Sequence, residues 1–196
     1  MDLVNAGLKA GHGQAGDEHT QATTPEAICV SLDGWHHYRH ELDLFPDPKE
    51  AHWRRGAAFT FDMAKYLAFV KALRDPSSPA TPFFLFDHAL KDPSPAPTPV
   101  LPHHRVVVIE GLYTLLDRDG WREAAQMMDV KVWIEVDRQV ARRRLVERNF
   151  VAGLCGTREE TERRVDQSDM ANGEEVREFR VEPTDVVVSV DLPSTH

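Results

Sequence analysis

The chain has 196 residues, enough for one domain with a substantial hydrophobic core. Hydrophobic residues make up 41% of it and charged residues 28%, as in ordinary globular proteins, which excludes a fibrous or wholly disordered chain. The 32 acidic residues outnumber the 23 Lys and Arg residues and give a formal net charge of −9. This charge argues against a nucleic-acid partner, because surfaces that bind nucleic-acid phosphates are basic.

The sequence predicts neither a membrane partner nor secretion. The most apolar runs, residues 106–109 and 186–190, are far shorter than the roughly 20 residues of a membrane span. The N-terminus lacks the basic start and apolar core of a secretory signal. Cys29 and Cys155 have the spacing of neither a disulfide framework nor a zinc site. We therefore expect a cytoplasmic protein.

The first half of the chain contains few predicted elements. Residues 1–27 should form a flexible segment, because almost no apolar residue occurs after the first few. Residues 28–32 are rich in β-branched side chains and predict a buried strand that ends at Asp33. Residues 60–74 have apolar side chains at helical spacing, with Thr60 or Asp62 available as the N-cap.

The second half predicts alternating strands and helices. Residues 76–102 hold eight of the 13 prolines and should be largely extended loop, with a short strand near residues 83–87. Residues 106–109 are apolar at every position, which is typical of a central parallel strand. The same patterns predict helices over residues 121–128, 138–150 and 157–166, and strands over residues 130–136 and 185–190.

The order of these elements predicts an α/β fold with a parallel sheet covered by helices on both faces. We expect one domain over residues 28–196, with ligands at the carboxyl ends of its strands. Residues 151–173 contain Gly153, Gly156 and Gly173 around a charged helix. They could form a lid that excludes water, although an ordinary surface loop has the same composition.

Three acidic residues follow predicted strands. Asp33, Asp87 and Glu110 each come directly after an apolar run. If the strands are parallel, these carboxylates meet at one edge of the sheet, where they could hold Mg²⁺ and accept a proton. The alternative is that they simply begin loops, as acidic residues often do.

Histidines and arginines supply further candidates. His36, His37, His40 and His52 lack metal-type spacing, so we interpret them as part of a polar loop or helix start. His88 follows Asp87 and could donate to a substrate oxygen, or lie on a surface loop. The helix after residue 136 carries five arginines, of which Arg144 and Arg148 share a face and suit phosphate. The alternative is a solvated face paired with the neighbouring glutamates Glu135, Glu147, Glu159 and Glu160.

Several of these segments together resemble the uridine kinase, phosphoribulokinase and pantothenate kinase group of P-loop kinases, and its nucleoside-kinase-like fungal and bacterial members in particular. The resemblance covers roughly residues 28–190. It rests on an ordered set of matches: Asp33-Gly34-Trp35-His36, residues 54–62, Phe86-Asp87-His88, Val108-Ile109-Glu110-Gly111 and residues 142–148.

The resemblance implies a role for each candidate residue. Asp33 would be the catalytic carboxylate beside the acceptor hydroxyl, and Glu110 would be the Walker B acid that holds Mg²⁺. Asp62, Asp87 and His88 would bind the acceptor substrate, a nucleoside or similar small metabolite. The arginines at the base of the lid, Arg144 and Arg148, would contact the phosphates of ATP.

One family motif is missing from this sequence. The group begins with a strand and a loop of the form G-x-x-x-x-G-K-[ST], which cradles the nucleotide phosphates. Residues 11–18 have a similar glycine spacing but place Asp17 where the lysine belongs. The fold should therefore lack the first strand and the phosphate loop, and the uncovered sheet edge would favour association into homo-oligomers.

Two functional hypotheses remain open from the sequence. The first is ATP-dependent phosphoryl transfer to a hydroxyl of a nucleoside or similar small metabolite. The second is a catalytically inactive relative or fragment that binds a metabolite or a protein, because the missing loop would remove several charge-assisted hydrogen bonds to phosphate.

Overall fold

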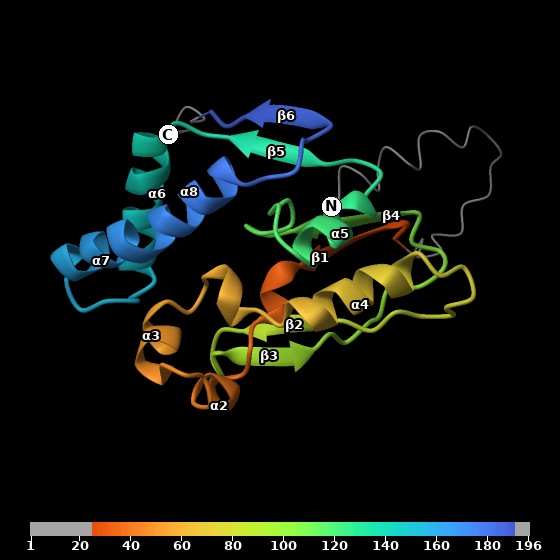
Figure 1. The fold of residues 1–196 in the computed structure, drawn as a ribbon, viewed down its shortest axis with the longest axis horizontal. Coiled ribbons are helices and arrows are strands. Elements are labelled where there is room, and N and C mark those ends of the chain that lie inside the picture. The colour runs from red at the N-terminus through yellow and green to blue at the C-terminus, as the bar shows by residue number, and fades with distance from the viewer. Residues whose placement is uncertain (1–24, 191–196) are drawn as a thin grey trace, which may run out of the picture.

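The computed structural model describes residues 25–190 (Figure 1). The flexible segment predicted for residues 1–27 lies almost wholly outside the described residues. Both cysteines are free thiols, Cys29 in a strand and Cys155 between two helices. Within residues 25–190, no helix has the length and apolar character that crossing a membrane requires.

Two pairs of parallel strands form the framework and confirm the α/β prediction. Strand β1 (Ala27–Ser31) pairs with β4 (Val106–Glu110), and β5 (Val132–Glu135) pairs with β6 (Asp185–Val188). The four segments are the β-branched runs of the sequence, which suit a pleated surface. In Figure 1 the β5–β6 pair lies beside the β1–β4 pair but is not joined to it.

A third pair of strands corrects the prediction of a mainly extended loop over residues 76–102. Strand β2 (Phe84–Asp87) was expected, but it pairs in antiparallel fashion with β3 (Asp92–Pro95), which was not. Strand β3 contains two prolines, which lack the backbone N–H that a central strand needs. The pair tolerates them because it is a two-stranded ribbon with free edges.

The helices follow the predicted order, with additions. Helix α4 (Met63–Leu73) is capped by Asp62, whose Oδ1 accepts from Lys65 N. The polar stretch before it folds into short helices: η1 (Leu32–Trp35), α2 (Arg39–Leu42), α3 (Pro48–Trp53) and η2 (Ala58–Thr60). Later come α5 (Trp121–Gln126), α6 (Arg138–Val151), α7 (Arg158–Arg164), the π-helical η3 (Val165–Asp169) and α8 (Met170–Glu178).

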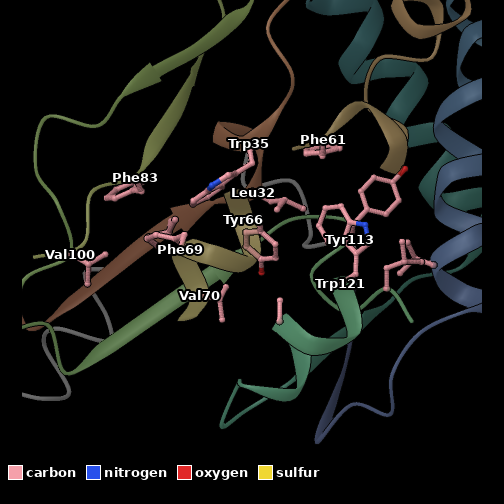
Figure 2. Close-up of a cluster of buried hydrophobic side chains, with 14 residues drawn as sticks. Leu32, Trp35, Phe61, Tyr66, Phe69, Val70, Phe83, Val100, Tyr113 and Trp121 are labelled. Atoms are coloured by element: carbon pink, nitrogen blue, oxygen red, sulfur yellow. The ribbon is translucent and has the colours of Figure 1, made fainter. Parts of the chain in front are cut away.

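The main hydrophobic core lies between η1, α4 and α5. Figure 2 shows Trp35, Tyr66 and Trp121 at its centre, with the rings of Trp35 and Phe69 4.7 Å apart. Such aromatic contacts add to the free energy gained by burying these large side chains. The core therefore fixes the turn after β1, which carries Asp33.

Strand β4 differs from the prediction of a buried central strand. Among the described residues it pairs only with β1, and its Val108 is exposed. A cavity of about 880 Å³ separates it from β5, lined by residues 106–109 on one side and 128–132 on the other. The apolar run at residues 106–109 predicted a central strand, whereas the expected loss of the resembled kinases' first strand predicted an uncovered edge, and within residues 25–190 β4 has that uncovered edge.

We predict that Gly34→Ala destabilises the fold by about 1–3 kcal/mol, because overpacking distorts the backbone. A Cβ atom at Gly34 would lie 1.9 Å from the carbonyl oxygen of Phe84. Chemical denaturation measures the change. Gly173→Ala is the matched control, since nothing lies within 4 Å of its Cβ position, and we expect it to stabilise α8 by about 0.5–1 kcal/mol. Equal effects at the two positions would contradict the close contact.

We also predict concentration-dependent self-association, because β5 and β6 expose apolar side chains beside an unpaired edge. Ile134 is 62% exposed and Val187 is 53% exposed. Ile134→Lys with Val187→Lys should shift the chain toward the monomer in sedimentation velocity, since charge opposes edge pairing. Leu44→Lys, at an exposed site in the turn after α2, should leave the association unchanged. Equal effects of both changes would contradict this interface.

Candidate functional site

Two of the predicted carboxylates lie at the same end of the parallel pair. Glu110 is the last residue of β4 and pairs in register with Ser31 of β1. Asp33 follows two residues later in η1, and its side chain is 53% exposed. The carboxyl ends of β1 and β4 thus bring Asp33 and Glu110 to one open edge, as the sequence predicts.

Asp62 reaches this site through the start of α4. Its backbone N–H donates to the carbonyl of Trp35 at 2.7 Å, and the preceding residue, Phe61, forms a β-bridge with His36. The Asp62 carboxylate pairs with Lys65 Nζ at 2.6 Å. Burial opposes ionisation of Asp62, but the hydrogen bonds and charge of Lys65 outweigh it and lower the pKa of the carboxyl.

Asp87 and His88 approach from a different direction than predicted. Asp87 is the last residue of the antiparallel strand β2 and His88 follows it, so Asp87 does not end a strand of the parallel pair. Gly34 allows the backbone of β2 to pack directly on η1, which places the ring of Phe86 5.1 Å from that of His36. Asp87 Oδ1 accepts from the N–H groups of Ala89 and Leu90, so one of its oxygens already caps a turn.

His36 lies between these groups, a position that the sequence analysis missed. Its ring contacts Phe61 at 4.0 Å, and its Nδ1 lies 2.9 Å from the carbonyl oxygen of Asp33. A carbonyl only accepts, so Nδ1 carries the proton. Burial lowers the pKa of His36, which leaves Nε2 as an acceptor at neutral pH. The Asp-x-x-His spacing was the available signal.

A second missed group is the ion pair of Arg55 with Asp92. Arg55 Nη2 lies 3.0 Å from Asp92 Oδ1 and 2.8 Å from the carbonyl of His37, and Nη1 donates to the carbonyl of Lys91. Arg39 binds the other oxygen of the same carboxylate at 3.3 Å. Through Arg55 and Arg39, these hydrogen bonds and ion pairs hold the β2–β3 ribbon against the loops next to His36. No sequence pattern links residues this far apart.

The arginines of α6 lie apart from the carboxylates. Arg144 Nη1 donates to Ser189 Oγ at 2.8 Å, and Arg148 Nε donates to Asn149 Oδ1 at 3.4 Å. Elsewhere the helix makes surface ion pairs, such as Arg142 with Asp166 at 2.6 Å and with Glu162 at 3.8 Å, neither of which is a glutamate that the alternative interpretation named. Arg144 is thus held next to the end of β6, and Arg148 is held by its neighbour on α6.

The carboxylate end of the parallel pair suits Mg²⁺ of the kind that accompanies a nucleotide. No group of three or more His, Cys, Asp and Glu side chains in the described part of the chain could enclose a metal ion by itself. Mg²⁺ usually keeps several waters and takes only one or two carboxylates plus substrate phosphates. Exposed Glu110 with neighbouring Asp33 matches that donor set.

The chain offers fewer groups that could bind the triphosphate of ATP. The backbone N–H groups and lysine of a G-x-x-x-x-G-K-[ST] loop do not occur anywhere in the 196-residue sequence. Residues 106–109 of β4 line the cavity described above, and within residues 25–190 no strand pairs with that side of β4. A kinase site has an acceptor side, which binds the molecule to be phosphorylated, and a nucleotide side, which binds ATP. The residues of this chain supply more of the acceptor side than of the nucleotide side.

Comparison with known proteins identifies the family. The sequence model of the Phosphoribulokinase / Uridine kinase family matches residues 47–153. The chain belongs to this family. The match begins at Asp47, the N-cap of α3, and ends just after α6, so it includes Asp62, Asp87, Glu110 and the arginine-rich helix.

Relatives and solved structures agree with this assignment. The "ATP-dependent kinase-like protein notR'" of Aspergillus versicolor is 38% identical over 159 residues, covering 80% of this chain and 92% of that protein. A Schizosaccharomyces pombe protein assigned as a uridine kinase is 36% identical over 83% of this chain and 69% of its own. A crystal structure from Silicibacter sp. TM1040, assigned as a fructose transport system kinase, has a TM-score of 0.76 at 28% identity and covers 94% of this chain and 80% of that one.

These similarities support ATP-dependent phosphoryl transfer at the level of the family, with ATP, Mg²⁺ and a small-molecule substrate. They do not favour the non-catalytic alternative.

We predict that Asp92→Asn lowers the free energy of unfolding by about 2 kcal/mol at pH 7, since hydrogen bonds to charged groups are lost. Burial opposes ionisation of Asp92, but the bonds from Arg39 and Arg55 lower its pKa overall. A lowered pKa stabilises the fold above the unfolded-state value of about 3.9. The difference between wild type and variant should therefore vanish as the pH falls through the folded-state pKa.

Unfolding measured by denaturant between neutral and acidic pH tests this prediction. Asp119→Asn, at a fully exposed side chain, is the control and should change stability little at any pH. A difference for Asp92→Asn that stays constant down to acidic pH would contradict the role of the ion pair.

Proposed function

We propose that this chain is built to transfer the γ-phosphoryl group of ATP to a hydroxyl of a nucleoside or similar small metabolite. The main support is that Asp33, two residues after β1, and Glu110, the last residue of β4, lie at the same end of the parallel pair. A carboxylate at that position can accept the proton of an acceptor hydroxyl, and phosphoryl transfer depends chiefly on positioning and charge. Membership of the kinase family supports the same reaction.

Each proposed catalytic role follows from the side chain's chemistry. Asp33 accepts the hydroxyl proton as the acceptor oxygen forms its bond to phosphorus. Glu110 holds Mg²⁺, which when bound supplies positive charge against the phosphate oxygens. Arg144 and Arg148 bind phosphate oxygens from the base of the lid at residues 151–173, because a guanidinium donates several hydrogen bonds and stays charged.

The acceptor is held on the other side of Asp33. Asp62 and Asp87 each have hydrogen-bonding capacity left beyond their contacts with Lys65 and the turn at Ala89, and they accept from hydroxyls of the substrate. His88 donates to a substrate oxygen. His36, with Nε2 unprotonated, adds one more acceptor beside Asp33. This arrangement suits a neutral polyhydroxylated molecule, since several acceptors face it.

The remaining elements of the proposal concern assembly and location. The kinase-like domain spans residues 28–196, acts in the cytoplasm without a membrane or nucleic-acid partner, and associates into homo-oligomers through its open sheet edge. The phosphate loop is the part that the chain does not contain, so full activity requires a loop to complete the nucleotide side.

We predict that a chain carrying a phosphate loop N-terminal to residue 1 phosphorylates an acceptor from a panel of nucleosides and related polyols, and that the 196-residue chain does so far more slowly. In the loop-bearing chain, Asp33→Asn should lower kcat by about 10²–10⁴-fold, the usual contribution of general base catalysis. ATP binding should remain, because Asp33 serves the acceptor. Coupled ADP release and calorimetry measure the two quantities.

Asp43→Asn serves as the control for this prediction. Asp43 pairs with His52 at 2.8 Å on the surface, so its loss should leave kcat unchanged. Unchanged turnover in Asp33→Asn would exclude the proposed role of Asp33, and a loop-bearing chain that phosphorylates nothing in the panel would overturn the proposed function.

A further inference from the structure

A π-helical turn interrupts the helical run that follows α6. Residues Val165–Asp169 form η3, between α7 and α8. π-helical turns are rare and occur often at functional sites, because they shift the side chains that follow them on the helix. Here the turn directs Ser168 and Asp169 inward, where Ser168 is 1% exposed. Neither side chain belongs to the residues discussed so far.

Asp169 is connected to Arg148 through one buried amide. Asn149, which is 3% exposed on α6, donates from Nδ2 to Asp169 Oδ2 at 2.8 Å. The other end of the same amide, Oδ1, accepts from Arg148 Nε at 3.4 Å. Both ends of the amide are thus in use, so its orientation is fixed and the direction of the Arg148 side chain depends on it.

The carboxylate is kept in this place at an energetic cost. Burial raises the pKa of Asp169, while its bond to Asn149 and the charges of Arg164 and Arg148 act in the opposite direction. A hydrophobic residue of similar size would pack between these helices without that penalty. Packing alone therefore does not explain why a carboxylate, with its cost of burial, occupies position 169.

The same helical run also contacts the acceptor side of the site. Asn172, three residues after Asp169 and 3% exposed, accepts from Arg54 Nη2 at 3.0 Å. Arg54 precedes the loop that leads to Asp62, and the carbonyl of Gly56 in that loop accepts from Tyr113. Hydrogen bonds on the η3–α8 run thus reach Arg148 in one direction and the acceptor loop in the other.

We propose that Asp169 and Asn149 are positioning residues that hold the Arg148 guanidinium in place for nucleotide phosphates. The inference rests on the proposed function, which places Arg148 at those phosphates. Asp169 does not touch the nucleotide: it fixes Asn149, and Asn149 orients Arg148. The hydrogen bond between Asn172 and Arg54 fixes the position of the η3–α8 run relative to the loop that leads to Asp62 on the acceptor side.

Binding of inorganic tripolyphosphate to the 196-residue chain tests the proposal, measured by calorimetry. We expect Asp169→Ala to weaken binding about three- to tenfold, because Asn149 loses its partner. Simple electrostatics predicts the opposite sign, since a negative charge near an anion site is removed. Asp169→Asn keeps an acceptor for Asn149 and should restore binding to near the wild-type value. Asp166→Asn, on the outer side of the same turn, is the matched control and should have little effect.

Two further measurements complete the test. In an Arg148→Gln background, Asp169→Ala should have no additional effect on tripolyphosphate binding. In the free protein, the Arg148 Nε–H should exchange with solvent faster in Asp169→Ala than in wild type, as seen by NMR, and a thermal melt shows whether the variant is folded. This exchange measurement needs no ligand.

Three results would overturn the proposal: tighter binding in Asp169→Ala, equal weakening by Asp166→Asn, or no saturable binding that depends on Arg148. Unchanged Nε–H exchange in folded Asp169→Ala would do the same. A different result would contradict the proposed function alone: a loop-bearing chain that transfers no phosphoryl group, while the Asp169 variants still change tripolyphosphate binding as expected.

Discussion

The close contact between Gly34 and the backbone of β2 is the constraint on which the acceptor side depends. The turn after β1 can lie against Phe84 only because position 34 has no side chain. This contact places Phe86 beside His36, and the aromatic core beneath holds Trp35 from below. Asp33 is therefore presented on a rigid turn rather than on a mobile loop, which suits a group that must meet a hydroxyl in one geometry.

The two sides of the site are built to different degrees of completeness. On the acceptor side, the Arg55–Asp92 pair, the capped start of α4 and the packed ring of His36 all restrict movement. On the nucleotide side, residues 106–109 of β4 line a cavity, Glu110 is exposed, and the arginines of α6 are held by Ser189 and Asn149. This asymmetry agrees with the proposed function, in which a phosphate loop completes the nucleotide side.

Local patterns in the sequence predicted most of the fold. The β-branched runs correctly predicted the parallel strands, and Asp62 was one of two predicted N-cap candidates and is the N-cap of α4. Both features depend on residues that are close in the chain. The pairing of β3 was missed, since it depends on which strands meet in space, whereas the open edge of β4 agrees with the expected loss of the first strand. The convergence of Asp33 and Glu110 followed from parallel topology. The position of His36 and the Arg55–Asp92 pair did not, because tertiary packing creates both.

The gap between β4 and β5 also bears on how the protein opens under native conditions. No strand-to-strand hydrogen bonds connect the two parallel pairs in the described part of the chain, and every residue of β6 is exposed. The β1–β4 pair, by contrast, lies on the aromatic core. Amide protons of β5 and β6 should therefore exchange through local opening of low free energy, while those of β1 exchange only with global unfolding. The half of the domain that carries Asp33 is thus its more stable cooperative unit.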